Sequence, residues 1–81
     1  MTRNDLILKI QGTSKDDDKG FQEVVAAILD GEFLTETDLC REVGASKPTI
    51  RRWKEGKNSP HSVLRPRVFR YLIKKLQEED P

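Results

Sequence analysis

One short stretch of the chain holds most of the side chains suited to contact with a polyanion. Residues 46–58 contain five cations, two hydroxyls and one side-chain amide, against a single acid, Glu55. A guanidinium can bond O6 and N7 of guanine together, and ammonium, hydroxyl and amide groups can bond phosphate oxygens. These residue types at this density indicate nucleic-acid recognition.

The net charge of +1 conceals an uneven distribution. Residues 1–42 hold five basic and ten acidic side chains, whereas residues 43–81 hold ten basic and four acidic ones. A local positive field attracts nucleic acid even when the overall charge is near zero. Charge alone is equally compatible with an ordinary solvated surface. The secondary structure that carries the cations is needed to distinguish the two interpretations.

Those elements follow the pattern of two helices joined by a tight turn. Counting from Glu36, the fifth residue is the small Cys40 and the ninth is Gly44. Helices that meet at about 90–120° need a small side chain where they touch. Glycine reaches the positive φ with which the chain leaves the first helix. The apolar positions of the pattern are Leu39, Val43, Ala45, Ile50 and Trp53. The sequence therefore predicts a helix-turn-helix.

Capping signals set the bounds of both helices. Thr35 is the expected N-cap of the first, with Asp38 as its capping-box partner. Ser46 is the expected N-cap of the second, and Pro48 falls in its first turn, where the missing N–H has no partner to lose. Gly56 is expected to end that helix.

Further helices are expected on both sides of this motif. An amphipathic spacing begins at Phe21 and closes at Gly31, and a second apolar pattern covers residues 68–76. Pro66 is expected to interrupt a short turn before that last helix. The predicted fold class is all-α: a compact bundle of four or five short helices containing a helix-turn-helix, in a domain of residues 21–77.

Residues 1–20 are predicted to be an N-terminal arm and acidic linker. Asn4 is a candidate N-cap, but the apolar run behind it is too short for its period to separate helix from strand. Residues 16–18 are three consecutive aspartates, typical of a solvated linker, whereas a calcium loop needs acidic ligands at alternate positions. Residues 78–81 are expected to fray. The structure and role of residues 1–18 stay open.

Several classes of function are not expected from this sequence. It has no apolar run long enough to cross a membrane and no signal peptide. The single Cys40 suits a reducing compartment, so a cytoplasmic location is expected. With one cysteine and one histidine, His61, a zinc site is not expected, and no catalytic constellation or phosphate loop is present. We expect no enzymatic activity, no cofactor and no small-molecule ligand, and we expect Trp53 in the core and His61 on a surface loop.

Residues from about Phe21 to Leu76 resemble the Cro/lambda-repressor-like (XRE-type) DNA-binding domain. The resemblance rests on LTETDLCREVGASKPTIRRWKEGKNSP and covers roughly two-thirds of the chain. It implies that the helix of residues 47–55 lies in the major groove of an operator. The base contacts it implies are Lys47, Pro48, Thr49 and Arg52. The phosphate contacts it implies are Ser46, Arg51, Lys54, Lys57 and Asn58.

Three features depart from the family pattern. Glu36 stands where the family often has a glutamine that bonds phosphate, and a carboxylate there would repel phosphate. Pro48 replaces a residue that often reads a base. The segment of residues 60–68 is longer than usual, and it leaves open whether Arg65, Arg67 and Arg70 contact DNA or only solubilise the surface.

The function expected on these grounds is that of a bacterial or phage transcriptional regulator that binds double-stranded DNA sequence-specifically, as repressors do. A homodimer through Phe69 and Ile73 of the last helix is one expectation, and a last helix covered by the first twelve residues is its equal alternative. An excisionase-like architectural accessory factor and an antirepressor-like or antitoxin-like interaction module remain as other functions. The operator sequence, the sense of regulation and the oligomeric state are not given by the sequence.

Overall fold

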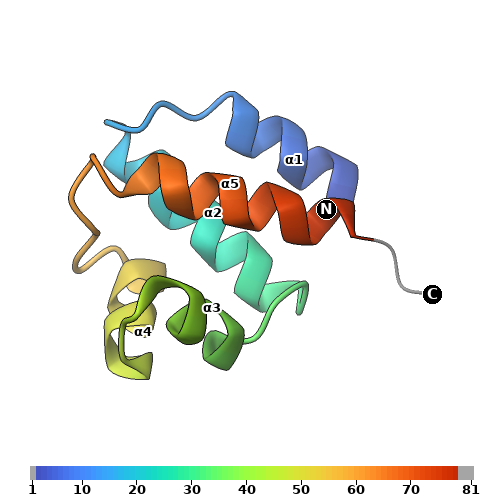
Figure 1. The fold of residues 1–81 in the computed structure, drawn as a ribbon. Coiled ribbons are helices and arrows are strands. Elements are labelled where there is room, and N and C mark those ends of the chain that lie inside the picture. The colour runs from blue at the N-terminus through green and yellow to red at the C-terminus, as the bar shows by residue number, and fades with distance from the viewer. Residues whose placement is uncertain (1, 79–81) are drawn as a thin grey trace.

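Five α-helices make up most of the computed structural model, which describes residues 2–78 (Figure 1). They are α1 (Arg3–Gln11), α2 (Asp18–Asp30), α3 (Glu36–Val43), α4 (Lys47–Glu55) and α5 (Arg65–Gln77). Residues 2–78 contain no strand, so the expected all-α class with five short helices is confirmed. None of the helices described has the length and apolarity that a bilayer crossing requires. Most of the tail expected to fray, residues 79–81, lies outside the described residues, as does Met1.

The predicted bounds of α3 and α4 are confirmed by their caps. Thr35 Oγ1 accepts a hydrogen bond from the Asp38 backbone N–H at 3.1 Å, and Asp38 Oδ2 accepts from the Thr35 N–H at 3.4 Å. Ser46 Oγ accepts from the Thr49 N–H at 3.4 Å. Both helices end in left-handed glycines, Gly44 with φ 72° and Gly56 with φ 77°. Local signals therefore determine where both helices begin and end.

The N-terminal segment forms a helix, and its cap is not the expected one. Thr2 Oγ1 accepts from the Asp5 N–H, and Asp5 Oδ2 accepts from the Thr2 N–H, each at 3.1 Å. This reciprocal capping box starts α1 two residues before the predicted cap Asn4, which lies inside the helix. Leu6 and Ile10 of α1 are buried in the same core as the later helices. The residues expected to form an arm thus contribute to the domain.

The last helix also begins earlier than predicted. α5 starts at Arg65, and Pro66 lies in its first turn instead of interrupting a separate one. The first backbone N–H groups of a helix have no intrahelical acceptor, so the proline loses no hydrogen bond there. Its fixed φ suits the start of a helix.

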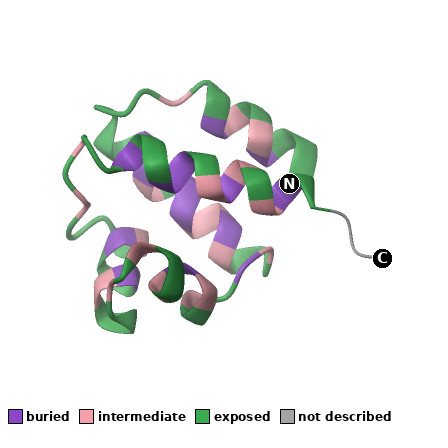
Figure 2. Cartoon of the chain, viewed as in Figure 1, coloured by how far each residue is buried: buried purple, intermediate pink, exposed green. Residues whose placement is uncertain are grey.

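An aromatic cluster lies at the centre of the core. The ring of Phe21 in α2 meets Trp53 edge-on, with 5.7 Å between centroids, and lies 5.8 Å from Phe69 of α5. Edge-to-face and tilted pairs at these separations are favoured by the ring quadrupoles. The core location predicted for Trp53 is confirmed, and Figure 2 shows buried residues on the sides of the helices that face one another.

The packing of α5 bears on the expected dimer surface. Phe69 is only 8% exposed because it contacts the core, and Ile73 is half-buried against that core. α1 packs along α5, as Figure 1 shows, and also contacts α2. The helix is thus covered by the N-terminal residues, and Phe69 offers almost no surface to a second copy.

Candidate nucleic-acid interface

The outer face of α4 is defined by the two residues that turn inward. Ile50 is fully buried and Trp53 nearly so, which anchors α4 against the core. Residues on the opposite side of the helix must then face solvent. Lys47, Pro48 and Arg52 are exposed there, and Thr49 is half-buried at the edge of the face. All four predicted base-contact residues thus lie on or beside one surface.

The two cations of this face are available to a ligand. Within residues 2–78, neither Lys47 nor Arg52 takes part in an ion pair. No acidic side chain stands in the first turn of α4 to offset them. Within residues 2–78, the Lys47 ammonium and the Arg52 guanidinium therefore donate hydrogen bonds to solvent alone.

Two hydroxyls form a polar pair at the start of α4. Ser46 Oγ and Thr49 Oγ1 lie 3.0 Å apart, so one donates to the other. Two hydroxyls carry two protons, and a single hydrogen bond between them leaves the second proton for another acceptor. The helix N-terminus also favours a negative charge at this position. Ser46 is therefore placed to meet a phosphate without giving up its cap.

Arg51, predicted to contact phosphate, already has an anionic partner. Its Nε donates to Glu36 Oε2 at 3.0 Å, which joins the first residue of α3 to the middle of α4. Glu36 therefore does more than repel phosphate: it holds the two helices together and neutralises a cation. Of the predicted phosphate contacts, this one is weakened by the structure.

Lys54 is engaged in a similar way. Its Nζ lies 2.6 Å from Asp30 Oδ1 at the end of α2. The hydrogen bond and the charge of Asp30 raise the pKa of the Lys54 ammonium, opposed by desolvation, with smaller contributions from Glu36 and Glu55. Lys54 therefore ties α4 to α2 and is a less available donor to phosphate.

The loop after α4 retains more freedom. Lys57 Nζ is 3.6 Å from Glu55 Oε2, and both side chains are well exposed. Asn58 Oδ1 accepts from the Ser59 N–H at 2.8 Å, which leaves its amide NH₂ as a donor. Exposed ion pairs of this kind are weak and exchange readily with other partners. Lys57 and Asn58 stay suitable for phosphate.

Arg65 belongs to the interior of the structure. It is 4% exposed, and its guanidinium donates to Lys15 O at 2.8 Å, Ser59 Oγ at 2.8 Å and Pro60 O at 3.2 Å. It also pairs with Asp18 Oδ1 at 2.6 Å and lies 5.4 Å from the centroid of the Phe21 ring. Arg65 thus joins the loop of residues 12–17 and the loop of residues 56–64 to the start of α5. Its guanidinium is therefore not available to DNA.

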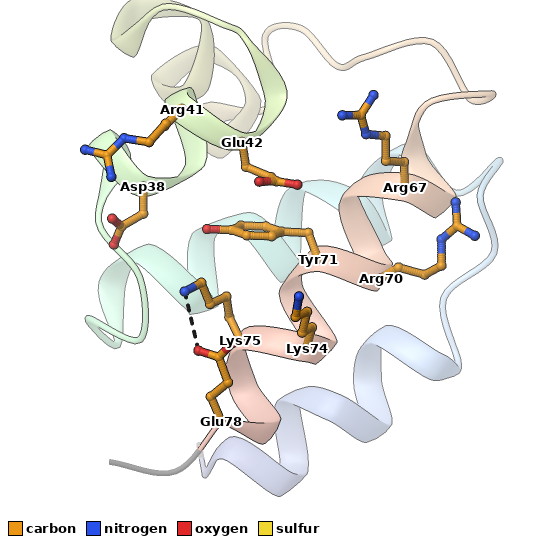
Figure 3. Close-up of a pocket in the computed structure, with 9 residues that line it drawn as sticks. All are labelled: Asp38, Arg41, Glu42, Arg67, Arg70, Tyr71, Lys74, Lys75 and Glu78. Atoms are coloured by element: carbon orange, nitrogen blue, oxygen red, sulfur yellow. Dashed lines mark hydrogen bonds and ion pairs between the residues drawn. The ribbon is translucent and has the colours of Figure 1, made fainter. Parts of the chain in front are cut away.

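Arg67 and Arg70 lie instead along a charged cleft between α3 and α5, shown in Figure 3. The cleft has a volume of about 500 Å³ and mixes cations with the carboxylates of Asp38 and Glu42. Tyr71 lies across it with its hydroxyl toward α3, while the two arginines project at the other end (Figure 3). This surface is separate from the outer face of α4.

The remaining candidate residues have local roles. His61 is exposed, as expected of a surface loop, and its Nδ1 accepts from the Val63 N–H at 3.2 Å. Cys40 is a half-buried free thiol packed against the core. Residues 2–78 contain no group of three or more histidine, cysteine, aspartate or glutamate side chains placed to hold a metal ion.

Comparisons of the chain with protein-family models, with curated proteins and with solved structures found no match. The interpretation of the α4 face therefore rests on its own geometry and charge.

Proposed function

We propose that this chain binds double-stranded DNA and regulates transcription by placing α4 in the major groove of an operator. The observation that carries the proposal is the outer face of α4. Lys47 and Arg52 are exposed there and form no ion pair within residues 2–78, while Ile50 and Trp53 anchor the helix. An α-helix with its side chains is about 10–12 Å in diameter, and the major groove is about 12 Å wide, so it admits such a helix. Gly44 and Ser46 bring α3 and α4 together across a three-residue connection, as a helix-turn-helix requires.

Each residue of this face has a distinct chemical role in the proposal. Arg52 reads guanine through paired bonds to O6 and N7. Lys47 reaches guanine acceptors or a phosphate at the edge of the groove. Thr49 engages its hydroxyl with Ser46, so its methyl is the group left for a thymine methyl. Pro48 adds an apolar contact.

The phosphate contacts fall into two groups. Ser46, Lys57 and Asn58 have donors free for phosphate, whereas Arg51 and Lys54 must first leave Glu36 and Asp30. Only cations release counterions, so Lys47, Lys57, Arg51 and Lys54 together neutralise at most about four phosphates, and log affinity should fall against log salt with a slope no steeper than about −4. The tethered side chains thus lower the expected salt dependence.

The rival functions have less support. An excisionase-like factor normally continues into a β-hairpin, but the described residues after α4 contain loop, turn and α5 without a strand. An interaction module was suggested by Glu36, and the ion pair to Arg51 gives that carboxylate a role within the fold. The resemblance to Cro/lambda-repressor-like domains favours DNA.

Selection from a random duplex pool across a salt series tests the proposal. The wild type should enrich a preferred site, and Arg52→Ala should lose the preference at one or two base pairs while keeping a similar salt slope. Each lost base contact should reduce discrimination by about 1–3 kcal/mol. Arg70→Ala, an exposed arginine on α5, is the matched control and should select the wild-type site.

Two outcomes would contradict the proposal. A failure to retain duplex even at low salt would remove DNA as the partner. Selection of the same site by Arg52→Ala as by the wild type would remove α4 as the reading element. Retention with a steep slope and no preferred site would instead support the architectural alternative.

A further inference from the structure

An apolar groove lies beside the charged cleft, between the end of α3, α4 and the start of α5. Its volume is about 320 Å³, and Glu42 and Arg67 line both hollows, so the two are adjacent. The apolar part of the groove wall is formed by Val43, Ala45, Trp53, Pro60, Leu64 and Val68. Water in such a groove gains few hydrogen bonds, and its release to bulk favours an apolar occupant.

The rim of this groove exposes one large hydrophobic side chain. Leu64 is 52% exposed and lines the groove, and its neighbour Val63 is 69% exposed. A single exposed hydrophobic residue is ordinary, but one that lines an apolar groove extends the apolar surface of that groove. An anchor side chain seated in the groove would cover Leu64 as well.

A row of unpaired cations continues the surface along α5. Arg67, Arg70 and Lys74 are spaced three and four residues apart, so they share one side of the helix. No ion pair within residues 2–78 involves any of them, whereas Lys75 of the same cleft pairs with Glu78 at 3.4 Å. Figure 3 shows Arg67 and Arg70 projecting freely at the end of the cleft away from the Lys75 pair.

We propose that this surface docks an acidic segment of a partner protein that carries an apolar anchor side chain. The anchor enters the groove beside Leu64, and carboxylates of the segment pair with Arg67, Arg70 and Lys74. Charge complementarity sets the sign of the partner, because none of these three cations forms an ion pair within residues 2–78. Apolar burial fixes its position, and the charge pairs add register and association rate.

The same surface fits nucleic acid poorly. Sugar and phosphate groups gain nothing from the apolar groove wall, whereas an apolar anchor side chain buries its surface there. The proposed docking surface uses none of Lys47, Pro48 and Arg52, although Thr49 and Asn58, both proposed to contact DNA, line its apolar groove. The docking proposal therefore goes beyond the DNA-binding proposal, and the two surfaces adjoin at these two residues.

The test is selection of peptides from a displayed random library on the full chain. Enriched peptides should share an apolar residue next to aspartate or glutamate. The single tryptophan, Trp53, lines the groove, so its fluorescence should change on titration with a synthetic enriched peptide. Leu64→Ala and Arg67→Ala should each weaken that peptide about tenfold, as expected for an anchor contact and a charge-assisted hydrogen bond.

Matched variants separate this surface from general stickiness. Leu8→Ala removes another exposed leucine, 62% exposed on α1, and Lys47→Ala removes another exposed cation; both should bind the peptide as the wild type does. The proposal is overturned by a library that yields no enriched peptide, by enriched peptides without carboxylates, or by equal binding to Leu64→Ala. It is also overturned if Arg70→Ala and Lys74→Ala weaken duplex DNA and leave the peptide unaffected, since the row would then serve phosphates. Because duplex and peptide are titrated separately, failure of one proposal does not imply failure of the other.

Discussion

Arg51 Nε donates to Glu36 Oε2 at 3.0 Å, so the first residue of α3 is tied to the middle of α4. The pair is partly exposed, with the Arg51 side chain more open to solvent than that of Glu36. A phosphate that approached Arg51 would compete with this carboxylate and would be repelled by it. The pair thus orients α4 and also limits how strongly this edge attracts a polyanion.

Glu36→Gln is expected to increase duplex affinity. The amide can still accept from Arg51 but carries no charge, so Arg51 becomes available to phosphate. Affinity at moderate salt should rise about threefold to tenfold, and the salt slope should steepen by about one. Stability should change by less than about 1 kcal/mol because the pair is solvent-screened. Glu42→Gln, the same change on α3 at a residue outside this pair, is the control. Equal affinities for Glu36→Gln and the wild type would show that Arg51 does not reach DNA.

Arg65→Ala is expected to destabilise the fold strongly. The substitution leaves Asp18, Ser59 and two backbone carbonyls without the guanidinium that joins them. Removing one member of such a buried network should lower the free energy of unfolding by about 2–4 kcal/mol. Urea denaturation followed by Trp53 fluorescence measures the effect. Arg67→Ala, two residues on and exposed, should change stability by less than about 0.5 kcal/mol. Similar values for the two variants would contradict a structural role for Arg65.

The two left-handed glycines should respond differently to alanine. At Gly44 a Cβ would meet nothing within 4 Å, so only the positive φ opposes it, at about 1 kcal/mol. At Gly56 a Cβ would also come within 2.8 Å of the Gln22 side chain, whose Nε2 donates to Lys54 O at 3.3 Å. Gly56→Ala should therefore cost about 1 kcal/mol more than Gly44→Ala. The denaturant midpoints of the two variants measure this difference, provided that the free energy of unfolding depends equally on denaturant in both. A higher midpoint for Gly56→Ala than for Gly44→Ala would contradict the packing at Gln22.

Tyr71 should titrate above its ordinary range in the folded chain. Burial raises the pKa of its phenol, the carboxylates of Asp38, Glu42 and Glu78 raise it further, and Lys75 opposes them. The raised folded pKa means that the Tyr71 contribution to stability is complete below the unfolded pKa. It is lost as pH rises through the folded pKa. Tyr71 is the single tyrosine, so phenolate absorbance reports it directly, with the urea-unfolded chain as reference. In Tyr71→Phe this part of the loss of stability at alkaline pH should disappear. Equal midpoints of the phenolate titration in the folded and the unfolded chain would contradict a raised pKa for Tyr71.

Features set by neighbouring residues could be predicted from the sequence. The caps at Thr35 and Ser46 and the left-handed ends at Gly44 and Gly56 depend on residues within one turn, so their spacing was sufficient. The inward direction of Ile50 and Trp53 follows from helical periodicity, and it fixes which residues of α4 face outward. The sequence therefore predicts the outer face of α4 without reference to any tertiary contact.

Features set by distant residues could not be predicted in this way. Arg65 and Asp18 pair across 47 positions of sequence, and no local signal distinguishes this arginine from Arg67 or this aspartate from Asp16. The sequence predicts Asp17 to lie in a linker. In the structure its Oδ1 accepts from the Gly20 N–H at 2.8 Å, so Asp17 caps α2. The burial of Phe69 depends on the position of Phe21 in α2, and the apolar periodicity of α5 does not predict that position. The tethers on Arg51 and Lys54 likewise required the packing of α4 on its neighbours.

The order in which the helices pack has a consequence for local opening. α3 packs mainly on α4, and α4 on α2, while α1 joins α5 to α2. A fluctuation that lifts α4 from α2 therefore carries α3 with it and leaves α1 in place on α5. The amide protons of α3 and α4 should exchange with solvent as one cooperative unit, at a lower opening free energy than those of α1, α2 and α5. α4, the helix proposed to enter the major groove of DNA, thus belongs to the part of the molecule best able to change its angle without unfolding the rest.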